Sequence, residues 1–218
     1  KNTLYELEEF SHQNVLDQYV KEMANPSNVD DVINVFSKIT DSRSDLADKS
    51  LTLEWNTWRG LLLMDDGKIT THMGLDLKMQ PLYYALGKQP DIVCEYDKFH
   101  LAVEVTLQTG VKQYQSEGES VERHVGELQK KVLDSGDSRP VYGLFIAKSL
   151  NLDAVHYFQN LQNMPRPSLR HGGLVRIVPI EIQDFVALVS AAGPHVPVRS
   201  DSLFNFIEKS CRASVAAP

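Results

Sequence analysis

Hydrophobic and polar residues alternate most regularly near the middle of the chain. In residues 101–107 the aliphatic positions are Leu101, Val103, Val105 and Leu107. Because successive side chains of a strand point to opposite faces, Glu104 and Thr106 share the other face with Ala102. Residues 92–96 predict a preceding strand, and Asp97 and Lys98 predict a tight turn between the two strands. The pattern therefore predicts a β-hairpin over residues 90–110.

The segments before this hairpin show helical spacing of apolar residues. The helices expected there cover residues 1–25, 28–39 and 50–64. Ser27 is expected to cap the second of these helices. Residues 65–89 are interrupted by glycines and prolines, so we expect turns and a loop, with one short helix around Tyr83 and Tyr84. The N-terminal part of the chain is therefore predicted to be helical.

Helices and strands alternate after the hairpin. Buried strands are expected at residues 141–147 and 174–180, and helices at residues 120–133, 151–162, 181–191 and 203–207. In the first of these helices Glu122 and Arg123 are expected to face solvent. This order predicts an α/β fold, with a mixed central β-sheet flanked by helices. The expected units are an N-terminal helical segment at residues 1–49, a core at residues 50–192 and a C-terminal tail at residues 193–218.

The composition fits one domain with a substantial core. The chain has 218 residues, of which 42% are hydrophobic and 23% charged, as in ordinary globular proteins. It contains no apolar run of bilayer length and no signal-like N-terminus, so no membrane association is expected. Cys94, expected to be a buried thiol, and Cys211 are too few for a disulfide framework, which fits a reducing cytoplasm. Because the chain begins with Lys1 rather than Met, we expect a fragment of a longer protein.

The net charge of −7 bears on the possible partners. Phosphate contacts supply most non-specific affinity for nucleic acids, and they need clustered Lys and Arg. A stand-alone nucleic-acid binder is therefore not expected. The basic stretch around Arg166, Arg170 and His171 has two interpretations, a solvated loop or a DNA contact.

Two carboxylates of the predicted hairpin are candidates for chemistry. Asp91 opens the first strand, after a proline that restricts the backbone, and strand pairing can bring it near Glu104. Two carboxylates a few ångströms apart repel each other, and a cation between them offsets the repulsion. Mg²⁺ prefers such hard oxygen ligands. On spacing alone, an exposed aspartate and a strand glutamate on a solvated face is the other interpretation.

Glu54 lies at the edge of the apolar stripe expected on the helix at residues 50–64. Helical spacing places it beside Trp58 and Leu61, and a carboxylate at the edge of an apolar face needs a partner. Two interpretations stay open. Glu54 forms a salt bridge at the rim of the core, or its carboxylate is aimed into the same site as Asp91.

Several of these residues follow one another in a specific order. They are Leu53-Glu54-Trp55, Pro90-Asp91-Ile92, Glu104-Val105-Thr106, Glu117 and Arg123-His124. In this order the chain resembles the PD-(D/E)xK nuclease superfamily. More closely, it resembles the catalytic region of the AlwI-like type IIS restriction endonucleases and their nicking relatives. The match covers about residues 50–190.

The resemblance implies a metal site. Asp91, Glu104 and the carbonyl of Val105 would hold a catalytic Mg²⁺, for which Mn²⁺ can substitute. The superfamily usually has a lysine two residues after the glutamate. This chain has Thr106 there, as the AlwI-like group does, so another residue would have to take the lysine's role.

The candidates for that role come from the next helix. Glu117 could bind a second metal ion or orient water, and His124 could act as a general base or contact the phosphate, because its pKa lies near the working pH. His124 could also be a helix-face histidine satisfied by a neighbour. Gln113 and Arg123 also belong to the positions that carry the resemblance. If the helix begins early, Gln113 lies on the same side of it as Glu117 and His124. Glu54 matches a helical glutamate that the superfamily often places beside the metal.

The resemblance therefore implies a metal-dependent DNA endonuclease, the cleavage domain or subunit of a type IIS restriction enzyme. Its partners would be double-stranded DNA, a separate DNA-recognition domain or subunit, and a second catalytic domain for double-strand cleavage. The separate recognition unit is expected because the sequence shows no zinc-finger or helix-turn-helix pattern. Two alternatives stay open. One is a catalytically inactive nuclease-fold subunit for DNA binding or assembly, which loss of the lysine favours, and the other is an enzyme of the same fold that acts on RNA.

Overall fold

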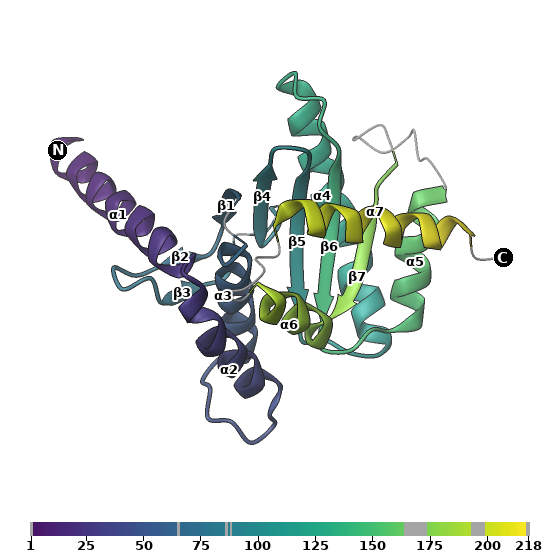
Figure 1. Ribbon diagram of the computed structural model, residues 1–218, viewed down its shortest axis with the longest axis horizontal. Helices are drawn as coiled ribbons and strands as arrows, with labels where there is room; N and C mark the ends of the chain where they lie inside the picture. Colours follow the sequence, from purple (N-terminus) through teal and green to yellow (C-terminus); the bar gives the residue numbers. More distant parts are fainter. Residues whose placement is uncertain are drawn as a thin grey trace.

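A five-stranded mixed sheet forms the centre of the computed structural model, which describes residues 2–64, 66–85, 87, 89–163, 174–192 and 199–216 (Figure 1). Its strands, in spatial order, are β1 (Gly67–Thr71), β4 (Ile92–Tyr96), β5 (His100–Thr106), β6 (Val141–Ala147) and β7 (Ile177–Glu181). Strands β1, β4 and β5 pair antiparallel, whereas β5, β6 and β7 run parallel. The predicted α/β class and mixed sheet are confirmed.

Helices cover both faces of this sheet. They are α1 (Asn2–Met23), α2 (Val29–Thr40), α3 (Lys49–Leu62), α4 (Val111–Asp134), α5 (Leu152–Asn163), α6 (Ile182–Ala191) and α7 (Ser200–Ala216). Helices α4 and α5 pack on one face, and α2, α3, α6 and α7 contribute to the core on the other. Helix α1 projects away from the sheet (Figure 1). Helix α2 buries Val32, Phe36 and Ile39 in the same core as the sheet, so α2 is integrated into the fold.

The alternation of the central strand directs its residues to two different cores. Leu101 and Val103 pack in the core shared with α3, whereas Ala102 packs against α4. In the hairpin, Ile92 pairs with Val103. Asp91, one residue before Ile92, therefore lies opposite Glu104, on the face that α4 covers. The predicted hairpin and its effect on these two carboxylates are confirmed.

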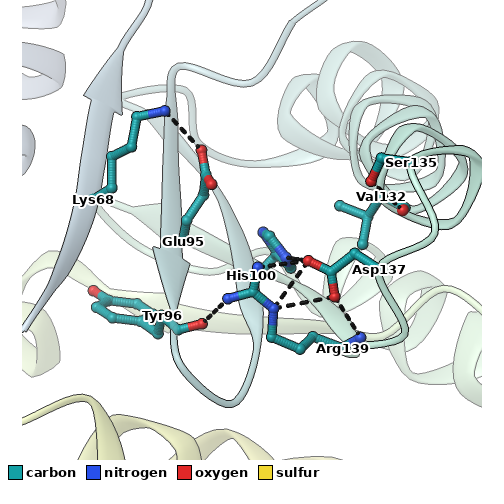
Figure 2. A network of polar contacts seen from close by, with 8 residues as sticks. All are labelled: Lys68, Glu95, Tyr96, His100, Val132, Ser135, Asp137 and Arg139. Atoms are coloured by element: carbon teal, nitrogen blue, oxygen red, sulfur yellow. Dashed lines mark hydrogen bonds and ion pairs between the residues drawn. The ribbon is translucent and has the colours of Figure 1, made fainter.

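A polar network fixes the other end of this hairpin (Figure 2). Asp137, in the loop after α4, accepts hydrogen bonds from Arg139 and lies 2.9 Å from Nε2 of the buried His100. Arg139 also donates from Nη1 to the carbonyl of Tyr96 at 2.5 Å. The loop that leads into β6 is thereby attached to both strands of the hairpin.

The segment between α3 and β4 differs from its prediction. It contains three strands, namely β1, β2 (Gly74–Leu75) and β3 (Pro81–Tyr83), where a loop and a short helix were expected. Tyr83 is extended and its ring packs over Gly74, at which a Cβ would lie 2.1 Å from Cζ of the tyrosine. The pairing of β2 with β3, in which Tyr83 lies opposite Gly74, takes the place of the helix predicted around Tyr83 and Tyr84.

Several helix boundaries also need correction. Residues Pro26–Asn28 form a short 3₁₀ helix, in which Asn25 accepts a hydrogen bond from Ser27 N at 3.0 Å, so Ser27 is not the cap of α2. Helix α3 begins one residue earlier than expected, at Lys49, with Asp48 as its cap. Strand β7 begins at Ile177 rather than at residue 174, and α7 extends well beyond residues 203–207.

Helix α4 begins nine residues before its predicted start, at Val111. Gly110 precedes it with φ 66°, a conformation that glycine adopts without strain. Gly118 is buried inside the helix, where a Cβ would lie 3.4 Å from Cδ1 of Tyr157, an ordinary contact distance. Glu122, expected to face solvent, is buried and accepts a hydrogen bond from the hydroxyl of Tyr157. The early start brings the polar residues of the first turns to the sheet.

Cys94 is a buried free thiol, as predicted. In the part of the chain that the structure describes, no helix combines the length and apolarity needed to cross a bilayer. The basic stretch around Arg166, Arg170 and His171 lies outside the described residues.

Candidate active site

Four carboxylates from four different elements converge at the edge of the sheet. Asp91 precedes β4, Glu104 lies in β5, Glu54 in α3 and Glu117 in α4. Their proximity is visible in their mutual effects, since Glu104 raises the pKa of Asp91, and both Glu117 and Glu54 raise the pKa of Glu104. The structure thus brings together all the carboxylates that the sequence singled out.

Asp91 is held by the strand beside it. Its Oδ2 accepts a hydrogen bond from the backbone N–H of Val105 at 2.9 Å. The preceding peptide is also fixed, because Nδ1 of His72 lies 2.6 Å from the carbonyl oxygen of Pro90. Burial, and then Glu104, raise the pKa of Asp91 well above its ordinary value, and the Val105 N–H opposes them in part.

Glu104 contacts α4 through a histidine. Its Oε1 lies 2.6 Å from Nδ1 of His124, and both side chains are about nine-tenths buried, at 11% and 8% exposed. Burial is the largest cause of the raised pKa of Glu104, followed by the charge of Glu117. A buried anion in this position needs positive charge or strong donors nearby.

Glu117 is linked to Thr106, the last residue of β5. The hydroxyl of Thr106 donates to Oε1 of Glu117 at 3.2 Å and accepts from the backbone N–H of Gln108 at 3.1 Å. Burial raises the pKa of Glu117, whereas the Thr106 hydrogen bond and His124 lower it. Thr106 therefore positions Glu117 rather than supplying a charge.

Glu54 reaches the cluster from α3 and is only 3% exposed. Its Oε1 accepts a hydrogen bond from the backbone N–H of Ala85 at 3.2 Å. Burial, and then the charge of Asp91, raise the pKa of Glu54 to about 8. Glu54 was expected either to form a salt bridge at the rim of the core or to aim its carboxylate into the site of Asp91. The placement matches the second interpretation, because Glu54 accepts from a backbone N–H and the nearby charge that raises its pKa is that of Asp91.

The surroundings of His124 favour the neutral form of its ring. Burial, and then Arg123, lower its pKa. Its Nε2 is buried and has no hydrogen-bond partner within the described ranges. Arg123 lies beside the cluster, where its charge lowers the pKa of Glu104 and its Nη2 donates to Ser120 Oγ at 3.4 Å.

Gln113 does not enter the carboxylate cluster. Its Nε2 donates to the carbonyls of Gln108 and Ser149 at 2.8 and 2.9 Å, and its Oε1 accepts from the N–H of Asn151 at 2.8 Å. The side chain is fully buried. Gln113 thereby joins the end of β5 to the beginning of α5, and it supports the site from behind.

Two of the four carboxylates, Glu54 and Asp91, open onto a cavity of about 490 Å³. Glu54, Asp91 and Thr106 line it, together with Tyr84 and Gln108. A neighbouring cavity of about 550 Å³ lies along α4 and shares His124 with the site. The site is therefore accessible from solvent on the side of α3 and β3.

The donor set fits a hard divalent cation. Among the described residues, no three His, Cys, Asp or Glu side chains are already arranged around one point as metal ligands. However, the carboxylates are buried and raise one another's pKa, which is the electrostatic situation that a bound cation relieves. Carboxylate and carbonyl oxygens are the ligands that Mg²⁺ prefers.

Sequence reasoning missed two residues beside the site, Asp48 and Tyr84. The hydroxyl of Tyr84 donates to both carboxylate oxygens of Asp48, at 2.8 and 2.7 Å. An aspartate just before a helical pattern is a recognisable cap signal. The contact with Tyr84 spans 36 residues and has no local signal in the sequence.

The mixed sheet, with helices on both faces, places Asp91 beside Glu104. The family model of the AlwI restriction endonuclease matches residues 4–188, so the chain belongs to the AlwI restriction endonuclease family. The structure is similar to the crystal structure of the small subunit of the heterodimeric restriction endonuclease R.BspD6I, with a TM-score of 0.67 and 23% identity. The similarity covers 84% of this chain and 89% of that one, and it shows the fold. No curated protein gives a significant sequence match.

Proposed function

We propose that this chain is the cleavage subunit or domain of a restriction enzyme and hydrolyses a DNA phosphodiester bond with the help of Mg²⁺. Membership of the AlwI family supports this proposal. The observation that carries it is the convergence of Asp91, Glu104, Glu117 and Glu54, each with a raised pKa. Keeping four carboxylates so close is costly for a purely structural protein.

Asp91, Glu104 and the carbonyl of Val105 are the proposed ligands of the ion, with Glu117 as a further ligand or a residue that orients water. Bound Mg²⁺ would lower the pKa of a coordinated water and neutralise charge on the phosphate. The Val105 N–H holds Asp91, and Thr106 holds Glu117. The chain thus fixes its carboxylates through the end of β5.

His124 is the proposed general base. With Glu104 ionised, its Oε1 accepts a hydrogen bond from Nδ1–H of His124, so the proton of the neutral ring is assigned to Nδ1 and Nε2 keeps its lone pair. Its pKa is lowered, so the ring is in the form that accepts a proton. Nε2 is the atom at which the proton of the attacking water would be held.

We propose that sequence recognition is supplied by another subunit or domain. The net charge of −7 gives this chain little affinity of its own for phosphates. The similar solved structure is the small subunit of a heterodimeric enzyme, which makes a partner subunit the natural source of DNA affinity. Cleavage of both strands would then need a second catalytic domain.

The first experiment is cleavage of supercoiled plasmid at low salt with Mg²⁺, Mn²⁺ or EDTA, next to an Asp91→Ala variant. Nicking or linearisation that depends on the metal and on Asp91 is the expected result. If the chain alone is silent, it is fused to a known DNA-binding module. A fusion that binds DNA but does not cut it with either metal would overturn the proposal and favour a non-catalytic DNA-binding or assembly subunit.

A further inference from the structure

Asp48 serves two elements at once, just before α3. Its Oδ1 accepts a hydrogen bond from the backbone N–H of Leu51 at 2.9 Å, which caps the helix. Both of its carboxylate oxygens also accept from the hydroxyl of Tyr84, which follows β3. One carboxylate therefore attaches the beginning of α3 to the segment after β3.

The same two segments meet again at Glu54. Ala85, the residue after Tyr84, donates its backbone N–H to Oε1 of Glu54 at 3.2 Å. Glu54 lies on α3, less than two turns after Asp48. The contacts form a closed ring that runs from Asp48 through Tyr84 and Ala85 to Glu54 and returns along the helix.

The hydrogen bond from the Tyr84 hydroxyl to Asp48 is the contact that holds Tyr84 in place within this set of contacts. Tyr84 is 46% exposed, so burial of its aromatic ring contributes little to holding its place. Its hydrogen bond is charge-assisted, since the acceptor is a carboxylate, and such bonds are stronger than neutral ones. Burial, and then Asp48, raise the pKa of Tyr84 to about 12, so the hydroxyl remains a donor at neutral pH.

We infer that Asp48 and Tyr84 are a positioning pair that places the Ala85 N–H and thereby aims the Glu54 carboxylate at the cluster around Asp91. This inference rests on the proposed function, since it assigns the pair to the same site. Without the pair, the segment after β3 is free to move, and Glu54 loses its donor. Tyr84 also lines the cavity of about 490 Å³, together with Glu54 and Asp91.

Three variants separate the pair from the helix cap. Tyr84→Phe removes only the hydroxyl. Asp48→Ser keeps a good capping residue for α3 but is too short to reach Tyr84. Asp48→Asn keeps both a cap and an oxygen acceptor, and it is the rescue variant. The matched control is Tyr83→Phe, which removes the hydroxyl of the neighbouring tyrosine, a side chain that is 55% exposed.

The first readout is independent of activity. Hydrogen exchange of the Ala85 amide, measured on the metal-free protein, should become faster in Tyr84→Phe and Asp48→Ser and reach the rate found in Glu54→Ala. Asp48→Asn and Tyr83→Phe should keep the wild-type rate. An unchanged Ala85 exchange rate in Tyr84→Phe overturns the inference.

The second readout is single-turnover cleavage at saturating DNA. Tyr84→Phe and Asp48→Ser should each slow the chemical step by about 10-fold, the scale expected for a displaced site residue, without weakening DNA binding. Because the two residues act through one contact, the double variant should be no slower than the singles. Unchanged cleavage beside faster Ala85 exchange would refute a positioning role. A wild-type protein that cuts no DNA even as a fusion would refute the proposed function instead, and Ala85 exchange would still decide whether the pair holds the segment.

Discussion

Nδ1 of His124 lies 2.6 Å from Oε1 of Glu104, and this contact joins α4 to β5 inside the candidate site. When Glu104 is ionised its carboxylate can only accept, so the ring nitrogen that faces it then donates. Nε2 then keeps a lone pair, and it is buried without a hydrogen-bond partner among the residues described. With Glu104 ionised, the contact therefore favours the tautomer of His124 that carries its proton on Nδ1.

Substitution can separate two possible roles of His124, namely accepting a proton at Nε2 and orienting Glu104 through Nδ1. In His124→Asn, the side-chain amide can replace Nδ1 as the donor to Glu104, but it has no group at the position of Nε2. If Nε2 accepts a proton, both His124→Asn and His124→Ala should slow single-turnover cleavage by about 100-fold or more. Recovery of most of the rate in His124→Asn would show that the histidine only orients Glu104. His156→Asn, an exposed position on α5, is the matched control.

Removing a carboxylate charge should stabilise the metal-free protein while it abolishes cleavage. The pKa of Asp91 is raised by burial and by Glu104, so its ionised form costs stability at neutral pH. Asp91→Asn removes the charge and keeps an oxygen for the Val105 N–H. In EDTA its melting temperature should exceed that of the wild type, by roughly 2–4 °C for each kcal/mol gained.

Mg²⁺ should reverse this difference, because an ion held by Asp91 and Glu104, as proposed, would bind only the folded wild type and stabilise it by mass action. Calorimetric melting curves, recorded once with EDTA and once with Mg²⁺, measure the difference in melting temperature between Asp91→Asn and the wild type under each condition. The exposed Asp45→Asn variant should change neither curve. A lower melting temperature for Asp91→Asn in EDTA would mean that the protein itself already compensates the charge.

Arg59 joins α2 to α3, and the two ends of its ion pair lie in different surroundings. Its guanidinium is 7% exposed, bonds to Asp31 and to Oδ1 of Asn56 at 3.1 Å, and lies 4.4 Å from the ring centre of Trp55. The side chain of Asp31 is 59% exposed. Loss of Asp31 therefore leaves a buried cation short of a partner, whereas loss of Arg59 leaves a hydrated carboxylate and removes a donor from Oδ1 of the buried Asn56.

We expect the two substitutions to differ in cost for this reason. Asp31→Ala should lower the free energy of unfolding by about 1–3 kcal/mol, the cost of an unsatisfied buried group. Arg59→Met keeps the packing of the side-chain stem and should cost less. Urea denaturation measures both, with Arg43→Met in an exposed ion pair as a reference near zero. The reverse order would show that the contacts of Arg59 with Trp55 and Asn56 outweigh the ion pair.

The sequence pattern was sufficient for the central hairpin and for its carboxylates. The strict alternation of residues 101–107 determined which face Glu104 occupies, and a short polar turn determined the register that brings Asp91 opposite to it. These are local signals, in which period and turn act over a few residues. The same holds for β6, whose seven residues are all buried and uniformly apolar or small.

The segments that were predicted wrongly depend on contacts that the local pattern does not contain. Strand β1 has one buried residue, Ile69, and it is a strand because β4 pairs with it. The first turns of α4 are polar and contain Gly118, beside which Tyr157 of α5 packs. The bond between Tyr84 and Asp48 likewise joins distant segments. Tertiary contacts decided each of these cases against local propensity.

Asp137 should make the stability of the fold depend on acid. Hydrogen bonds from Arg139 and His100 hold the pKa of Asp137 well below its ordinary value of 3.8, and both contacts tie the loop after α4 to the hairpin (Figure 2). A carboxyl whose pKa is lower in the folded state stabilises the fold above the unfolded pKa, and this contribution is lost as pH falls through the folded pKa.

Asp137→Asn should therefore melt at a lower temperature than the wild type at neutral pH, and the difference should shrink as the pH is lowered below about 4. Melting curves between pH 7 and pH 2 in EDTA measure this difference. Asp153→Asn, an exposed aspartate in the first turn of α5, tests whether any aspartate would behave in this way, and its difference from the wild type should be small throughout. A difference for Asp137→Asn that stays constant down to pH 2 would mean that shape rather than charge accounts for its effect. In that case the ion pair with Arg139 would not be what fixes the far end of the hairpin.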